Sequence, residues 1–121
     1  MYQAAAALKT FFSGFDLPAY QNGTVPDDTP LPYITYSIGV PEWNQKATVY
    51  AQVWDRTKTN TRIIEVADKI TQAIGLCKRI PMNGGYLVLW PETPLVQIQT
   101  DGDFRSAYIN LSMNSYNMPG V

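Results

Sequence analysis

An amphipathic helix is the feature that most constrains the fold of this chain. The helix is predicted to begin at Thr59 or Asn60 and to end at Ile74, with Gly75 placed to cap it. Projection at 100° per residue gathers its apolar side chains into a stripe about 120° wide. The stripe consists of Ile63, Val66, Ala67, Ile70, Ala73 and Ile74. Such a helix must bury its stripe, so the rest of the chain has to supply an apolar surface.

Alternating sequences on both sides of this helix predict that the surface is a β-sheet. Residues 33–40 and 47–55 alternate between apolar and polar positions. In the second segment, one side is expected to carry Val49, Ala51 and Val53, and the other Tyr50, Gln52 and Trp54. After the helix, strands are predicted at 76–82, 86–90, 95–100 and 104–113, with turns at 83–85, 91–94 and 101–103.

The two ends of the chain complete this prediction. Residues 2–13 are expected to form a first helix, followed by a proline-rich loop at 16–32 that includes a short extended piece around Tyr20. Residues 114–121 are expected to be a flexible tail. The sequence therefore predicts a single α+β domain over residues 1–121. Its largely antiparallel or mixed sheet of about five strands has two helices packed on it.

Composition argues against several kinds of chemistry. The chain has no histidine, which removes the Ser-His-Asp and Cys-His nucleophile systems and the commonest metal ligand. Its net charge is -1, so it lacks the basic surface typical of nucleic-acid or anionic-membrane binding. Its single cysteine, Cys77, indicates a reducing compartment. We expect no enzyme, with no catalytic, cofactor-binding or metal-ligating residues.

Three local patterns have a chemical interpretation, and each also has a simpler one. Asp101-Gly102-Asp103 matches part of a calcium loop, but it lacks the other ligands and fits a hairpin turn. Asp55 and Glu65 could pair as acid and base, although both are more simply surface charges. Cys77 precedes two basic residues, which would favour a thiolate, but it has no partner base and is expected to pack as an apolar side chain.

A low charged fraction, 16%, and off-stripe apolar residues indicate a surface that an assembly covers. Ile64 projects about 100° away from Ile63, outside the core stripe. Trp43 and Trp54 add aromatic groups of the kind that interface centres favour. The alternative is a small RNA-binding module that would stack bases on Tyr50, Trp54 and Tyr108, but the net charge disfavours it.

The strand, loop and helix in the middle of the chain resemble a known family. Residues 50–62 (YAQVWDRTKTNTR) and 63–70 (IIEVADKI) are similar to the tail terminator, or tail completion, proteins of long-tailed bacteriophages. The first helix, the proline-rich segment before Pro32-Tyr33-Ile34-Thr35-Tyr36 and the length of 121 residues are similar too.

The resemblance implies a structural protein of the virion tail, assembled in the host cytoplasm, with no membrane. Such a protein forms a ring, typically hexameric, that caps the tail tube, ends tail polymerisation and joins the tail to the head connector. Its partners are other copies, the tail tube protein and the head connector or head-completion protein, and DNA passes through the lumen without being read. A head-completion or minor capsid protein of the same junction is the alternative. The expected subunit-interface residues are Trp43, Trp54, Arg56, Asn60 and Ile64.

Overall fold

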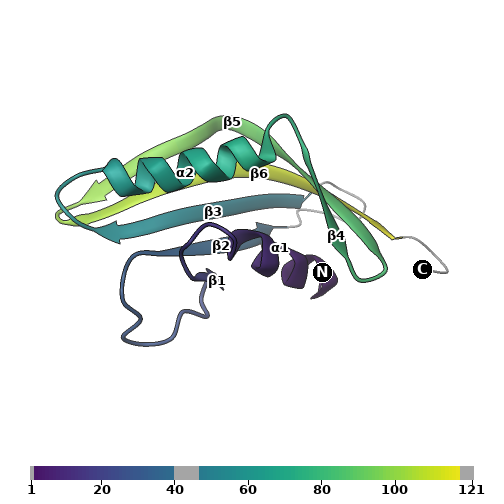
Figure 1. The fold of residues 1–121 in the computed structure, drawn as a ribbon, viewed down its shortest axis with the longest axis horizontal. Helices are drawn as coiled ribbons and strands as arrows, with labels where there is room; N and C mark the ends of the chain where they lie inside the picture. The colour runs from purple at the N-terminus through teal and green to yellow at the C-terminus, as the bar shows by residue number, and fades with distance from the viewer. Residues whose placement is uncertain (1, 40–46, 118–121) are drawn as a thin grey trace.

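The computed structural model describes residues 2–39 and 47–117, and they form a two-layer α+β fold (Figure 1). The elements in chain order are α1 (Tyr2–Phe12), β1 (Ala19–Gln21), β2 (Tyr33–Gly39), β3 (Ala47–Arg56), α2 (Thr61–Ile74), β4 (Lys78–Met82), β5 (Gly85–Asp101) and β6 (Phe104–Asn117). The predicted fold class is confirmed, with six strands in place of about five.

The strands form one mixed sheet in the order β1-β2-β3-β6-β5-β4. The short strand β1 runs parallel to β2, and every other neighbouring pair is antiparallel. The central pair, β3 and β6, is regular from Ala47 opposite Met113 to Arg56 opposite Phe104. Because directly opposite residues of an antiparallel pair share a face, this register fixes which side chains lie together.

Both helices cover the same face of the sheet, so the other face has no helix on it (Figure 1). On the helix side, Val49, Ala51 and Val53 of β3 are fully buried, as the alternation predicts. Helix α2 packs over β3, β6 and β5, and α1 packs near β1 and β4. Phe12 of α1 is completely buried and stacks on Tyr36 of β2, with ring centroids 5.4 Å apart.

Helix α2 buries most of the predicted stripe. Ile63, Val66, Ala67, Ile70 and Ile74 are buried. Ala73 is exposed, so its assignment to the stripe is wrong; it lies at the margin of the contact with the sheet. Gly75 ends the helix with φ 60°, and its N–H donates to the Thr71 carbonyl at 2.9 Å.

The largest difference from the sequence prediction lies in β5. The predicted turn at residues 91–94 does not reverse the chain, because β5 continues through it as one strand to Asp101. Its register with β6 shifts between Pro91 and Val96, which is a bulge and not a turn. The side chain of Ser112 donates to Glu92 at 2.6 Å, and that of Asn110 donates to the Pro94 carbonyl at 2.5 Å.

The C-terminal end of the sheet also extends beyond the prediction. β6 continues past Met113 to Asn117, so the expectation of a loose tail is wrong for residues 114–117. These residues pair with the start of β5, and Tyr116 stacks on Tyr86 with ring centroids 5.1 Å apart. Residues 118–121, and residues 40–46 between β2 and β3, lie outside the described residues.

Candidate functional site

Trp54 lies on the helix-free face, near the C-terminal end of β3. It points away from Val53 and its neighbours, and its indole is half-buried. Its Nε1–H donates to the Thr35 hydroxyl on β2 at 2.9 Å. Trp54 lies opposite Ser106, and beside it is an open hollow of about 420 Å³ whose lining includes Gln99 and Phe104. We call this feature the Trp54 hollow. An apolar side chain from outside could enter it next to the indole.

Other aromatic residues extend this face on both sides of the Trp54 hollow. Tyr50 and Tyr108 lie on neighbouring strands with ring centroids 5.3 Å apart. Burial raises the pKa of Tyr108 above its ordinary value of 10.0, and the nearby Tyr50 raises it further. Arg56 is exposed and lies over the Phe104 ring, 5.0 Å from its centroid. Phe104 itself is 44% exposed. The face is therefore aromatic and polar with few charges.

The opposite side of the molecule carries the remaining predicted interface residues that the structure describes. Ile64 is 43% exposed on the outer side of α2, which confirms that it lies outside the core stripe. Asn60 precedes the helix, but its side chain makes no capping hydrogen bond; its Oδ1 accepts from Arg105 Nη1 at 3.3 Å. Trp43 lies outside the described residues.

Arg105 is a structural residue that the sequence analysis missed. Its guanidinium donates to the Thr57 carbonyl, the Lys58 carbonyl and the Asn60 side chain, at 3.2, 3.2 and 3.3 Å. A single planar guanidinium group therefore contacts three residues of the loop from β3 to α2. The sequence did contain an indication of this role. Residue 105 alternates with Ala107 and Ile109 on the inward-facing side of β6, and it is charged.

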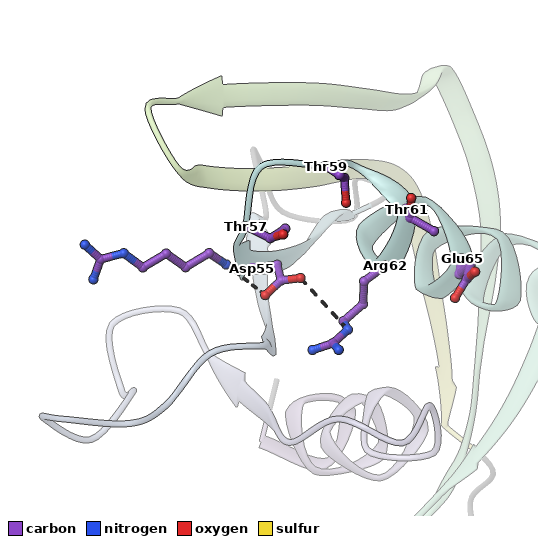
Figure 2. Close-up of a pocket in the computed structure, with 7 residues that line it drawn as sticks. Asp55, Thr57, Thr59, Thr61, Arg62 and Glu65 are labelled. Atoms are coloured by element: carbon purple, nitrogen blue, oxygen red, sulfur yellow. Dashed lines mark hydrogen bonds and ion pairs between the residues drawn. The ribbon is translucent and has the colours of Figure 1, made fainter.

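Asp55 lies beside a polar hollow of about 440 Å³ at the beginning of α2 (Figure 2). The prediction that Asp55 is a surface charge is wrong, because the residue is only 6% exposed. Its Oδ1 accepts the Arg56 backbone N–H at 2.8 Å, and its Oδ2 lies 4.0 Å from Arg62 Nε. Glu65 is one turn further along α2 and is exposed. One carboxylate oxygen of Asp55 thus accepts from the backbone at the end of β3, and the other lies at the limit of ion-pair distance from α2.

The other chemical candidates also have structural explanations. Asp101-Gly102-Asp103 forms the turn between β5 and β6, with Gly102 at φ 60°. Cys77 is exposed, so the expectation that it packs as an apolar side chain is wrong. It lies in the connection between α2 and β4, next to the exposed Leu76. Within residues 2–39 and 47–117, no group of three or more possible ligand side chains is placed to hold a metal ion.

The structure divides the predicted interface residues between two sides of the sheet. Trp54 and Arg56 lie on the helix-free face, and Asn60 and Ile64 lie on the helix side. The described residues define a two-layer α+β protein in which no helix covers the aromatic sheet face and the large apolar side chain of Ile64 is exposed on the outer surface of α2. No helix in the described part of the chain is long and apolar enough to cross a membrane.

Comparison with known proteins supports the fold. No family model matches the chain, and a search of curated proteins finds no match. One solved structure, of a protein whose name states no activity, aligns with a TM-score of 0.68 at 16% sequence identity. The alignment covers 98% of this chain and 96% of the other. At this level of identity the likeness concerns the arrangement of helices and strands alone.

Proposed function

We propose that this protein is a structural subunit that assembles with copies of itself into a ring, and that it acts as the tail terminator of a long-tailed bacteriophage. The ring would be hexameric, would cap the tail tube and end its polymerisation, and would join the tail to the head connector. DNA would pass through its lumen without being read. The phage role rests on the resemblance of residues 50–70, and the mode of assembly rests on the two sides of the fold.

The observation that carries the assembly proposal is the placement of Trp54 and Ile64 on opposite sides of the sheet. A closed ring needs a head-to-tail interface, in which one surface of a subunit meets a different surface of the next. We infer that Ile64 of one copy enters the Trp54 hollow of its neighbour. A hollow of about 420 Å³ has room for a branched aliphatic side chain beside the indole.

The energetics favour these two residues as the centre of the contact. Aromatic side chains in the middle of an interface commonly contribute more than about 2 kcal/mol to binding. Trp54 already has its indole N–H satisfied by Thr35, so covering it with an apolar partner leaves no buried donor unpaired. Arg56 is exposed and lies over the ring of Phe104, one of the residues that line the hollow.

Head-to-tail contact can be tested by mixing two variants. Trp54→Ala removes the hollow side of the interface, and Ile64→Arg removes the helix side. Wild-type protein is expected to form rings with a central hole in negative-stain micrographs, and each variant alone is expected to sediment without rings. A mixture retains one intact Trp54–Ile64 contact per pair of variants, so the two variants should bind each other in equal numbers without forming rings.

Neither residue is part of the core, so both variants are expected to fold. Circular dichroism checks that they do. A wild-type chain that sediments only as a monomer up to high micromolar concentration would refute the proposed self-assembly. Rings that persist in either variant would refute the assigned contact. Complementation of a tail-terminator-deficient phage separates the tail role from the head-completion or minor capsid role: overlong tails indicate the first, and normal tails without heads indicate the second.

An RNA-binding role is the second candidate, and the aromatic helix-free face is the observation that favours it. Bases could stack on Tyr50, Trp54 and Tyr108, and Arg56 could contact phosphate. A monomer that shifts labelled RNA, with an affinity that Trp54→Ala abolishes, would support this role in place of a ring.

A further inference from the structure

We infer that a second interface joins two copies of this protein edge to edge, through antiparallel pairing of residues 95–100 of β5 with the same residues of the other copy. The contact uses the outer backbone edge of β5, and it does not rest on the proposed ring, although Gln99 and Thr100 at one end of the segment also line the Trp54 hollow. It would join two subunits across a two-fold axis into one continuous sheet.

The first step is that this part of β5 is an open edge. β4 pairs only with Gly85–Leu89, so the second half of β5 has β6 on one side and no other strand among the described residues on its outer side (Figure 1). Every residue from Val96 to Asp101 is exposed, on both faces of the strand. An edge of this kind presents backbone N–H and C=O groups that another strand can pair with.

The second step is that this edge lacks the features that normally prevent such pairing. Natural sheets protect their edges with very short strands, charged side chains, prolines and bulges. The edge strand β1 has only three residues, and the edge strand β4 carries Lys78, Arg79 and Pro81. In contrast, residues 95–100 read Leu-Val-Gln-Ile-Gln-Thr, with no charge and no proline, and the pairing of residues 96–101 with β6 is regular. The two short edge strands are protected along their length, whereas in β5 the bulge and Pro94 lie before Val96 and leave residues 96–100 without such features.

The third step identifies the occupant as a second copy. Val96 and Ile98 lie opposite Ile109 and Ala107, which places them on the helix side; Gln97 lies opposite Tyr108, on the helix-free side. When two such edges pair about an axis perpendicular to the sheet, apolar residues meet apolar residues and glutamines meet glutamines. Because residues 95–100 carry no charge, identical edges do not repel each other.

The fourth step is that pairing covers apolar surface as well as backbone. Val96 is 36% exposed and Ile98 is 39% exposed, both on the helix side of this edge. Pairing about Gln97 sets Val96 against Ile98 of the other copy, and pairing about Ile98 sets the two isoleucines together. Either register extends the helix-covered side of each sheet into that of its partner.

A charge-swap experiment at Gln97 tests this inference, in the Trp54→Ala chain so that edge pairing is measured without rings. Gln97→Lys and Gln97→Glu each place like charges near the two-fold axis. Each variant alone is expected to dimerise about fivefold more weakly than the parent, and an equimolar mixture should recover the loss. Gln3→Lys, on the exposed surface of α1, carries the same change of charge and should dimerise like the parent.

Hydrogen exchange of the wild-type chain gives a second, independent readout. Amides of residues 95–100 are expected to become more protected as protein concentration rises, while those of β1 do not change. A parent chain that stays monomeric, a Gln97→Lys variant that dimerises like the parent, or a mixture without recovery would overturn the inference. Rings in the wild-type chain together with a monomeric Trp54→Ala parent would refute edge pairing and leave the ring proposal intact.

Discussion

Arg105 makes three hydrogen bonds to the loop before α2. Its three hydrogen bonds use the fixed geometry of the guanidinium, which an ammonium group cannot reproduce. We expect Arg105→Lys to lower the free energy of unfolding by about 1–2 kcal/mol in a urea titration. Arg62→Lys is the control, because Arg62 is exposed and contacts Asp55 only at 4.0 Å; it should change stability by less than about 0.5 kcal/mol. Equal losses in the two variants would contradict this role for Arg105.

The half-buried Arg105 and the buried Asp55 show which single-residue roles could not be predicted from the sequence. Both residues alternate with the inward-facing apolar positions of their strands, but the sequence analysis missed Arg105 and assigned Asp55 to the surface. Their meaning depends on the register of β3 with β6, which sets Asp55 directly opposite Arg105. That pairing joins residues 50 positions apart in the chain, and no local pattern encodes it.

Tyr36 provides a prediction about pH. Its side chain is 3% exposed under α1, and burial raises the pKa of its hydroxyl above 10.0. The folded chain therefore holds this proton more tightly than the unfolded chain does. The stabilisation is complete below pH 10 and is lost as pH rises through the folded-state pKa. Urea titrations from pH 8 to pH 11 should show a fall in stability at the alkaline end that is smaller in Tyr36→Phe. An identical fall in both proteins would show that Tyr36 does not contribute.

At the scale of elements, α2 offers a matched pair of neighbouring residues. Ile63 is 1% exposed and Ile64 is 43% exposed, although both are isoleucines in the same turn. Ile63→Ala should lower the free energy of unfolding by about 2–5 kcal/mol, because it leaves a cavity under the helix. Ile64→Ala should lower the free energy of unfolding by less than about 1 kcal/mol, because it changes an exposed residue. Thermal melts at a concentration below that of assembly provide the comparison, and similar losses would mean that the faces of α2 are misassigned.

The contrast between α2 and β5 explains which elements the sequence could predict. The stripe of α2 is encoded locally, so Ile63, Val66 and Ile70 identified both the helix and its buried side. The path of β5 is decided by contacts with a distant strand. Pro91 and Pro94 read as a turn, but side chains of β6 hold this segment within the sheet as a bulge. The two prolines correctly indicated an irregularity, but the local sequence could not show that the strand continues beyond it.

At the scale of the whole molecule, the fold presents surfaces of different chemistry. The helix-free face is aromatic, the outer side of α2 exposes an isoleucine, and the second half of β5 is an uncharged edge. The sequence predicted the first two, because alternation and helical periodicity assign side chains to faces. The open edge could not be predicted, since it depends on β4 pairing with only the first residues of β5.

Salt dependence separates the two candidate functions of the aromatic face. A contact built on Trp54 and Ile64 is apolar, so raising NaCl from 0.1 M to 1 M should change the ring dissociation constant by less than about threefold. Base stacking on the same face would require phosphate contacts through cations such as Arg56. With about three such contacts, the affinity for single-stranded RNA would fall about a hundredfold over that range. Sedimentation velocity and fluorescence anisotropy of labelled RNA measure the two quantities on one sample. Assembly that dissolves in 1 M salt, together with tight RNA binding at low salt, would favour the RNA-binding role.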